Sequence, residues 1–345
     1  MMKKIVCLTL ALCMLFALCA CGNTQSNEQP AAQETPAAEP AGKPIEIKLT
    51  STNPSSNPEI VAMVSACDRI RERTDGMVDI QVYADGQMLV YAEGIEAVMS
   101  NSAVIYFTAC NLFSDYVPEF TTVYMPYLYS STEVAEEFFQ SDVWNQISEK
   151  ADAAGLHVIC NNIFTGYRHT FANRPVTTAA DFEGMTLRIP DSTLYIETFK
   201  ALKANYMPMA FSEVYSGLQT GMLEGVEATA ATAAGYSLYE TMDKPYYSLT
   251  KHILDNGGYF VGYDFWMSIP EEYRAIIEEE LYAAAVEGNE ANAAKEADFI
   301  QQLKDNGVEI VEVEDLSSFQ EAVADLVSSQ PMGQEVLDQI KEITG

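Results

Sequence analysis

The chain has 345 residues, and its 50 Asp and Glu residues against 19 Lys and Arg residues give a formal net charge of −31 at pH 7. A sequence this acidic carries no basic stripe for the phosphates of a nucleic acid, and it excludes broad adhesion to an anionic membrane surface. We therefore expect no nucleic-acid partner, and we attribute the charge to solubility outside the cell.

The first 21 residues have the form of an export signal. Lys3 and Lys4 precede a short apolar stretch, which ends in "LCAC". The small residue Ala20 before Cys21 resembles the lipobox of bacterial lipoproteins, in which the cysteine is acylated. We expect a signal peptide over residues 1–21 and a lipid on Cys21 that anchors the exported protein to the outer face of the cell membrane (or in the periplasm). The alternative is a plain secreted protein in which Cys21 is incidental.

Residues 22–44 are rich in Pro, Ala, Gln and Glu and cannot bury a core, so we expect a disordered tether there. The about 300 residues from Ile45 onward suffice for two domains of ordinary size. The cysteines that follow the signal are Cys67, Cys110 and Cys160. Because three is an odd number, no complete disulfide framework exists, and we favour three buried thiols over one bridge.

Strands and helices alternate in the first half of the chain. "IEIKLTS" (45–51) alternates apolar and polar residues, as a half-buried strand does. A helix begins at Pro58 and stops at Asp75-Gly76, and "MVDIQVY" (77–83) is a second strand. This β-α-β unit predicts parallel strands with a right-handed crossover. The next expected elements are helices over 92–101, 131–140 and 142–154 and strands over 103–107 and 155–163.

The second half continues the alternation and then contains one unusually long helix. "DNGG" (255–258) reads as a turn between two strands. Pro270 begins a helix that extends to Asn306-Gly307, and about 35 helical residues span about 50 Å, more than the width of one small domain. This helix is expected to cross two domains, which predicts a two-lobed α/β fold. The other expected elements are strands over 185–190, 205–209, 246–253 and 259–269 and helices over 193–204 and 212–221.

Motifs for catalysis or for metal binding are absent from the sequence. His157, His169 and His252 form no HExxH or HxxxH pattern, and there is no C-x-x-C. There is also no G-x-S-x-G elbow, no Walker loop and no G-x-G-x-x-G. We therefore expect a protein that is not an enzyme and has no catalytic residue, no metal and no cofactor. An exported hydrolase is the alternative, without a nucleophile-base pair to support it.

Three of the seven arginines, Arg168, Arg174 and Arg188, lie close together in the sequence. Arg188 is in the middle of an expected strand, so its side chain points to the opposite face from its neighbours, and Pro190 ends the strand. Open α/β sheets bind ligands at the carboxyl ends of parallel strands, and an arginine fork pairs with a carboxylate through two charge-assisted hydrogen bonds. Arg188 therefore favours recognition of an anion, with a salt bridge to one of the many acids as the alternative.

The segments around these arginines resemble a known family. "GYRHTFANRPVTTAADFEGMTLRIPDS" (166–192) and "MPMAFSEVYSGLQTGMLEGVE" (207–227) are similar to the signature of DctP-type solute-binding proteins, which serve tripartite ATP-independent periplasmic (TRAP) transporters. The resemblance covers essentially the whole mature chain. It extends to "DGQMLVYAEGIEAVMSN" (85–101), "TTVYMPYLYSSTEVAEEFF" (121–139) and "FWMSIPEEYRAIIEEE" (265–280).

The resemblance implies a fold and a function. Members have a periplasmic-binding-protein-like fold, in which two α/β lobes are hinged around a cleft and a long helix bridges both. They capture an organic anion, usually a carboxylate, and pass it to membrane subunits. We expect the same function here, in a monomer, with a solute-binding protein of an ABC transporter or a sensor as the alternative. The expected lobes are 45–162 plus about 253–290 (lobe I) and 163–252 plus about 291–345 (lobe II), with the helix at about 271–306.

The resemblance also implies site residues. Arg188 matches the arginine that pairs with the ligand carboxylate, and Arg168 matches a second arginine in the cleft. Arg174 matches a surface or structural position. Further candidate ligand contacts are the aromatic residues Phe211, Tyr236, Tyr263 and Trp266, for each of which core packing is the alternative, and Glu227.

The sequence departs from the family pattern at positions that contact the ligand in other members. Ala228, directly after Glu227, stands where an Asn is usual, and Tyr263 also replaces an Asn. Ala109 falls where some members carry an acidic residue. These changes predict that the carboxylate clamp is retained while the rest of the ligand is less polar than a heavily hydroxylated sugar acid.

Overall fold

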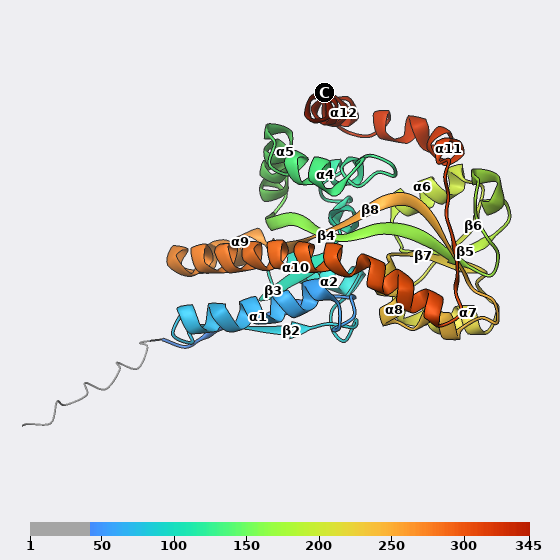
Figure 1. Ribbon diagram of the computed structural model, residues 1–345. Coiled ribbons are helices and arrows are strands. Elements are labelled where there is room, and N and C mark those ends of the chain that lie inside the picture. The colour runs from blue at the N-terminus through green and yellow to red at the C-terminus, as the bar shows by residue number, and fades with distance from the viewer. Residues whose placement is uncertain (1–41) are drawn as a thin grey trace, which may run out of the picture. The chain divides into compact units, whose positions relative to one another are not determined.

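One nine-stranded sheet extends through the part of the chain that the structure describes, residues 42–345 of a computed structural model (Figure 1). The expected signal peptide, the lipidation site Cys21 and most of the expected tether lie outside these residues. The strand order is β2-β1-β3-β8-β4-β7-β5-β6, and β9 pairs with β8. The strands are β1 (Ile45–Thr50), β2 (Val78–Tyr83), β3 (Val104–Thr108), β4 (Leu156–Ala172), β5 (Thr186–Ile189), β6 (Asn205–Pro208), β7 (Gly225–Ala228), β8 (Tyr246–Gly262) and β9 (Glu309–Val311).

Helices pack on both faces of this sheet. Two of them begin where a serine side chain accepts a hydrogen bond from the first turn, Ser131 from the Val134 N–H and Ser141 from the Trp144 N–H. The helices are α1 (Pro58–Arg73), α2 (Ala92–Met99), α3 (Glu119–Thr122), α4 (Thr132–Phe138), α5 (Asp142–Ala153), α6 (Thr193–Ala201), α7 (Val214–Gln219), α8 (Ala230–Gly235), α9 (Tyr263–Ser268), α10 (Glu271–Asp305), α11 (Ser317–Ser328) and α12 (Gly333–Thr344).

The β-α-β unit at the N-terminal end of the described chain is confirmed. Strands β1 and β2 are parallel, with Ile45 opposite Val78, and α1 connects them. Pro58 occupies the first turn of α1, where its missing N–H costs no hydrogen bond. The helix buries a face that includes Met63 and Ile70, so its packing against the sheet follows from the helical spacing of its apolar residues.

The prediction of a turn at residues 255–258 is wrong. Strand β8 continues through them, and its 17 residues pair with the equally long β4, with Leu156 opposite Gly262 at one end and Ala172 opposite Tyr246 at the other. The glycines there permit close packing, because a Cβ atom on Gly258 would lie 2.4 Å from the Cys160 carbonyl oxygen. The strand predicted over 259–269 therefore stops at Gly262, and helix α9 follows it.

The two halves of the sheet are joined by β4 and β8. We use lobe I for the half with β1, β2 and β3, and lobe II for the half with β5, β6 and β7. Strand β8 pairs with β3 of lobe I and β4 pairs with β7 of lobe II, so both long strands cross from one lobe to the other (Figure 1). The two-lobed α/β fold is thus confirmed, whereas the residue boundaries between the lobes stay a prediction.

The long helix α10 has 35 residues and packs against α1 of lobe I and α8 of lobe II, as expected for a helix that bridges both. It is fastened to β4 near its middle. The Asn289 amide accepts from the Phe164 N–H at 2.7 Å and donates to the Asn162 carbonyl at 2.8 Å, and Asn292 donates to the Phe164 carbonyl at 3.1 Å. These bonds fix α10 at the place where β4 passes between the lobes.

Two further properties concern the described residues alone. Cys67, Cys110 and Cys160 are free thiols, as we favoured, although Cys160 is only partly buried. Within residues 42–345, no helix combines the length and the apolar character that crossing a bilayer requires.

Candidate functional site

A cavity of about 90 Å³ lies between the two lobes, beside β4 and β8. This volume has room for several ordered waters, or for a small ligand in their place. Four of the predicted ligand contacts line it: Arg168, Arg188, Phe211 and Tyr236. The remaining three, Tyr263, Trp266 and Glu227, do not line it.

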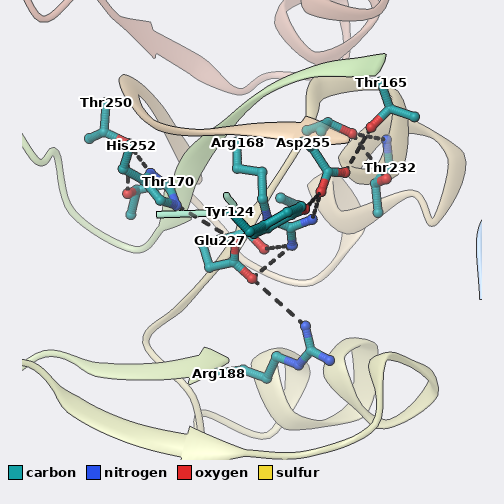
Figure 2. Close-up of polar contacts among 12 residues, drawn as sticks. Tyr124, Thr165, Arg168, Thr170, Arg188, Glu227, Thr232, Thr250, His252 and Asp255 are labelled. Atoms are coloured by element: carbon teal, nitrogen blue, oxygen red, sulfur yellow. Dashed lines mark hydrogen bonds and ion pairs between the residues drawn. The ribbon is translucent and has the colours of Figure 1, made fainter. Parts of the chain in front are cut away.

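Arg168, on β4, is held by two carboxylates (Figure 2). Its Nε and Nη2 atoms donate to the two carboxylate oxygens of Glu227, the latter at 2.7 Å, and its Nη1 donates to Asp255 Oδ1 at 3.1 Å. Burial works against the charged form, but the two carboxylates outweigh it and hold the pKa of Arg168 well above its ordinary value. The positive charge of Arg168 is therefore neutralised by the protein itself.

Glu227 is fully buried on β7, and its carboxylate contacts the arginines instead of the cavity. Burial opposes its ionisation, yet the charge of Arg168 leaves the pKa of Glu227 below its ordinary value, so the carboxylate is ionised. The Nε2 atom of His252 lies 3.6 Å from the same carboxylate, and burial lowers the pKa of this histidine. Glu227 does not line the cavity and its carboxylate positions Arg168, while direct contact of Glu227 with a ligand stays a prediction.

Asp255, on β8, has both carboxylate oxygens occupied. Oδ1 accepts from Tyr124 as well as from Arg168, and Oδ2 accepts from Thr165 Oγ1 at 2.7 Å. Arg168 and these neighbours, all of which line the cavity, form a hydrogen-bond network (Figure 2). Such a network fixes the side chains that line this part of the cavity before a ligand enters.

Arg188 is in a different environment, at the carboxyl end of β5. Its Nε and Nη2 atoms both donate to the Met209 carbonyl, at 2.9 and 2.7 Å, and its guanidinium carbon lies 5.0 Å from the centre of the Phe211 ring. The carboxylate nearest to its Nη1 is that of Glu227, at 4.0 Å. Burial lowers the pKa of Arg188, and neighbouring groups oppose this only in part. Arg188 thus offers the cavity a cation whose charge is incompletely compensated.

Besides the 3.4 Å bond from Arg188 Nη2 to the Tyr91 hydroxyl, three side-chain hydrogen bonds connect the lobes across the cavity. Each joins a loop of lobe I to lobe II, so the cavity is closed by direct contacts between them. The bonds are from the Phe211 N–H to the Tyr91 hydroxyl (2.9 Å), from Asn111 Nδ2 to Ser192 Oγ (2.8 Å) and from the Tyr236 hydroxyl to the Thr52 carbonyl (2.6 Å).

Tyr263 and Trp266 do not line the cavity, and contact of either side chain with a ligand stays a prediction. Trp266 is 1 % exposed and belongs to the apolar core beneath α1, where its ring stacks on His157 at 5.2 Å. The reason is the continuity of β8: Tyr263 follows Asp255 by eight positions, which is about 26 Å along an extended strand.

Sequence reasoning missed several residues of the cavity, above all Tyr91, Asn111 and Asp255. Tyr91 and Asn111 follow strands β2 and β3 of lobe I. Their position after the carboxyl ends of parallel strands could have identified them as candidate ligand contacts. Asp255 had no such signal, because it belonged to a segment interpreted as a turn. In residues 42–345 no group of His, Cys, Asp and Glu side chains is arranged to hold a metal ion.

Comparisons with known proteins agree with this architecture. The family of bacterial extracellular solute-binding proteins, family 7, matches residues 49–331. A solute-binding protein from Chromohalobacter salexigens is 27% identical over 271 residues, which are 78% of this chain and 79% of that protein.

Solved structures are similar over nearly the whole described chain. A TRAP periplasmic solute-binding protein from Fusobacterium, with bound sn-glycerol-3-phosphate, is 29% identical, covers 87% of this chain and 99% of its own, and superposes with a TM-score of 0.81. Another from Actinobacillus succinogenes, with bound L-galactonate, is 26% identical, covers 86% and 99% of the two chains, and has a TM-score of 0.81.

Proposed function

This chain belongs to the bacterial extracellular solute-binding proteins of family 7, the solute-binding subunits of TRAP transporters, and from this premise we propose that it captures one small organic anion in the cavity between its lobes and delivers it to the membrane subunits of such a transporter. Members of this family are substrate-binding components of transporters, and the family is not an enzyme family. The protein then acts as a lipid-anchored monomer that meets the transporter on the outer side of the membrane.

The observation that carries the proposal is the unequal charge balance of the two buried arginines. Arg168 has two carboxylates within hydrogen-bond distance, whereas Arg188 Nη1 has its nearest carboxylate at 4.0 Å. Removing a charge from water is costly unless a partner compensates it, so an incompletely paired arginine inside a cavity favours a ligand that brings the missing negative charge. We assign the anionic group of the ligand to Arg188.

The residues that line the cavity also indicate which groups the remainder of the ligand, beyond its anionic group, carries. Asn256 lines the cavity and is 2 % exposed, and its Oδ1 has no hydrogen-bond donor within residues 42–345, while its Nδ2 donates to the Asn161 carbonyl at 3.3 Å. A buried acceptor without a donor destabilises the site until a ligand supplies one. Relatives bind glycerol phosphate and galactonate, which carry hydroxyl groups. We therefore propose a hydroxylated anion, in place of the less polar ligand that the departures from the family pattern predicted.

A thermal-shift screen of the purified mature protein tests the proposal. The panel contains sn-glycerol-3-phosphate, L-galactonate and C4-dicarboxylates, with glycerol as the uncharged control. A ligand present at 100 times its Kd stabilises the folded state by about 2.7 kcal/mol, and Arg188→Ala should abolish the shift. The proposal fails if no anion shifts the wild type, or if Arg188→Ala responds as the wild type does.

The same fold also serves binding proteins of ABC transporters and of sensors, which is the alternative for the partner. Two adjacent genes for membrane subunits, one small and one large, support a TRAP transporter. The anchor is tested separately with Cys21→Ser, which should move the protein from the membrane fraction to the soluble fraction and leave ligand affinity unchanged. A variant that stays in the membrane fraction would contradict acylation of Cys21.

A further inference from the structure

The hydroxyl group of Tyr91 lies against Arg188 and lines the cavity. It accepts a hydrogen bond from the Phe211 N–H at 2.9 Å and a longer one from Arg188 Nη2 at 3.4 Å. A phenol has two acceptor positions and one proton to donate. Both acceptor positions are used by lobe II, and within residues 42–345 the hydroxyl proton has no acceptor.

The guanidinium of Arg188 is already partly used. Its Nε and Nη2 atoms form the side of the fork that would bind a carboxylate in parallel, and both donate to the Met209 carbonyl. The Nη1 atom is the donor that remains, with no hydrogen bond to the described part of the chain. Because Nη2 belongs to both parallel pairs of the fork, Arg188 has only Nη1, with its two N–H bonds, left for an anion, and a donor from another residue would complete a clamp.

We propose that Tyr91 is this second donor, so that the anion is held between the Arg188 Nη1–H of lobe II and the Tyr91 O–H of lobe I. The proposal rests on the function proposed above and adds how the anionic group is recognised. The group must present two acceptor oxygens, as a carboxylate or a phosphate does. Because the two donors belong to different lobes, the clamp is complete only when the lobes are together.

The backbone of Tyr91 supports a role beyond packing. Its φ of 51° and ψ of −127° form a conformation that residues other than glycine rarely adopt and that costs about 1–3 kcal/mol. The Tyr106 hydroxyl accepts from the Tyr91 N–H at 2.8 Å and holds this conformation. Gly94 leaves space for the Tyr106 ring, since a Cβ atom there would lie 2.8 Å from it. The backbone of Tyr91 is thus held by contacts within lobe I, independently of a ligand.

Calorimetry on wild type, Tyr91→Phe and Arg188→Ala tests the proposal, with sn-glycerol-3-phosphate and L-galactonate as the phosphate and carboxylate probes. Tyr91→Phe should weaken the probe that binds by about 10- to 100-fold, as expected for a lost hydrogen bond to a charged group. Tyr215→Phe is the matched control, because its hydroxyl donates to Glu240 outside the cavity. If Tyr91→Phe binds within about twofold of wild type while Arg188→Ala fails to bind, this inference is overturned and the proposed function stands. If neither probe binds, the anion that shifts the wild type in the screen replaces them, and if no anion binds the wild type, both proposals fall.

A second substitution distinguishes two roles of the Tyr91 hydroxyl: donating a hydrogen bond to the anion, and accepting hydrogen bonds from Phe211 and Arg188. Incorporation of 3-fluorotyrosine at position 91, at a pH where the phenol stays protonated, makes the hydroxyl a better donor and a poorer acceptor. Affinity should then rise, by up to about threefold, if the hydroxyl donates to the anion. A fall in affinity would show that Tyr91 acts only as an acceptor for its neighbours, and would overturn the proposal.

Discussion

Arg168 and Arg188 line the same cavity, yet the protein surrounds them differently. Arg168 has Glu227 and Asp255 as close partners, and Arg188 has a backbone carbonyl, an aromatic ring and a carboxylate at 4.0 Å. Both are largely buried, so burial does not separate them. The two arginines differ in how far their charges are compensated. A paired arginine stabilises the fold, and an incompletely paired one is available to a ligand.

The largest expected effect is on stability, from Arg168→Met. The substitution leaves the buried carboxylates of Glu227 and Asp255 without a cation, and breaking such a buried pair costs about 3–5 kcal/mol. Urea denaturation followed by circular dichroism measures this loss in the free energy of unfolding. A loss below about 1 kcal/mol would remove the distinction between the two arginines.

Arg188→Ala should affect binding more than stability. We expect about a 30-fold to several-thousandfold loss of affinity for the anion found in the screen, since one partner of a desolvated pair is removed. Arg188→Lys should recover only part, because one ammonium cannot hold the Met209 carbonyl and also reach the ligand. Calorimetry decides, and binding within about threefold of wild type would make Arg188 structural.

The pH dependence of stability sharpens the comparison, because His252 belongs to the Arg168 network. Burial holds the pKa of His252 below 6.5, and that of buried His169 well below it. The unfolded chain then binds protons below about pH 6.5 that the folded chain does not, so stability is full above that pH and declines as pH falls. The free energy of unfolding should therefore fall as the pH is lowered from about 7.5 to 5.5. His252→Gln should make this decline shallower, and a flat profile in the wild type would contradict the prediction.

The third arginine of the segment, Arg174, should show the smallest effect. Its Nη1 pairs with Glu224 at 2.7 Å, but its side chain is 40 % exposed. Glu224 also accepts from the Thr186 N–H, so it keeps a partner when Arg174 is removed. Arg174→Ala should cost less than about 1 kcal/mol of stability and leave ligand affinity unchanged. A larger loss in the same urea titration would show that exposure is a poor guide to the role of an arginine here.

Much of the fold could be predicted from local patterns. The spacing of apolar and polar residues along the sequence predicts the alternation of strands and helices and the long helix. It also predicts that Arg188 lies near the carboxyl end of a strand. The partner of each arginine could not be predicted in this way, because among 50 acidic residues only tertiary pairing selects Glu227 and Asp255. Glycines 257 and 258 show the same limit, since close strand packing and a turn both favour glycine.

The attachment of α10 to β4 through Asn289 and Asn292 has a mechanical consequence. The attachment divides the helix into two segments of unequal length. At 1.5 Å per residue, the segment from Asn289 to Glu271 is about 27 Å long and the segment from Asn292 to Asp305 about 20 Å. Any rotation about this attachment displaces the Glu271 end further than the Asp305 end, in proportion to the lengths of the two segments. If α10 rotates about its attachment to β4 when a ligand binds, a spectroscopic label near Glu271 should therefore report a larger displacement than a label near Asp305.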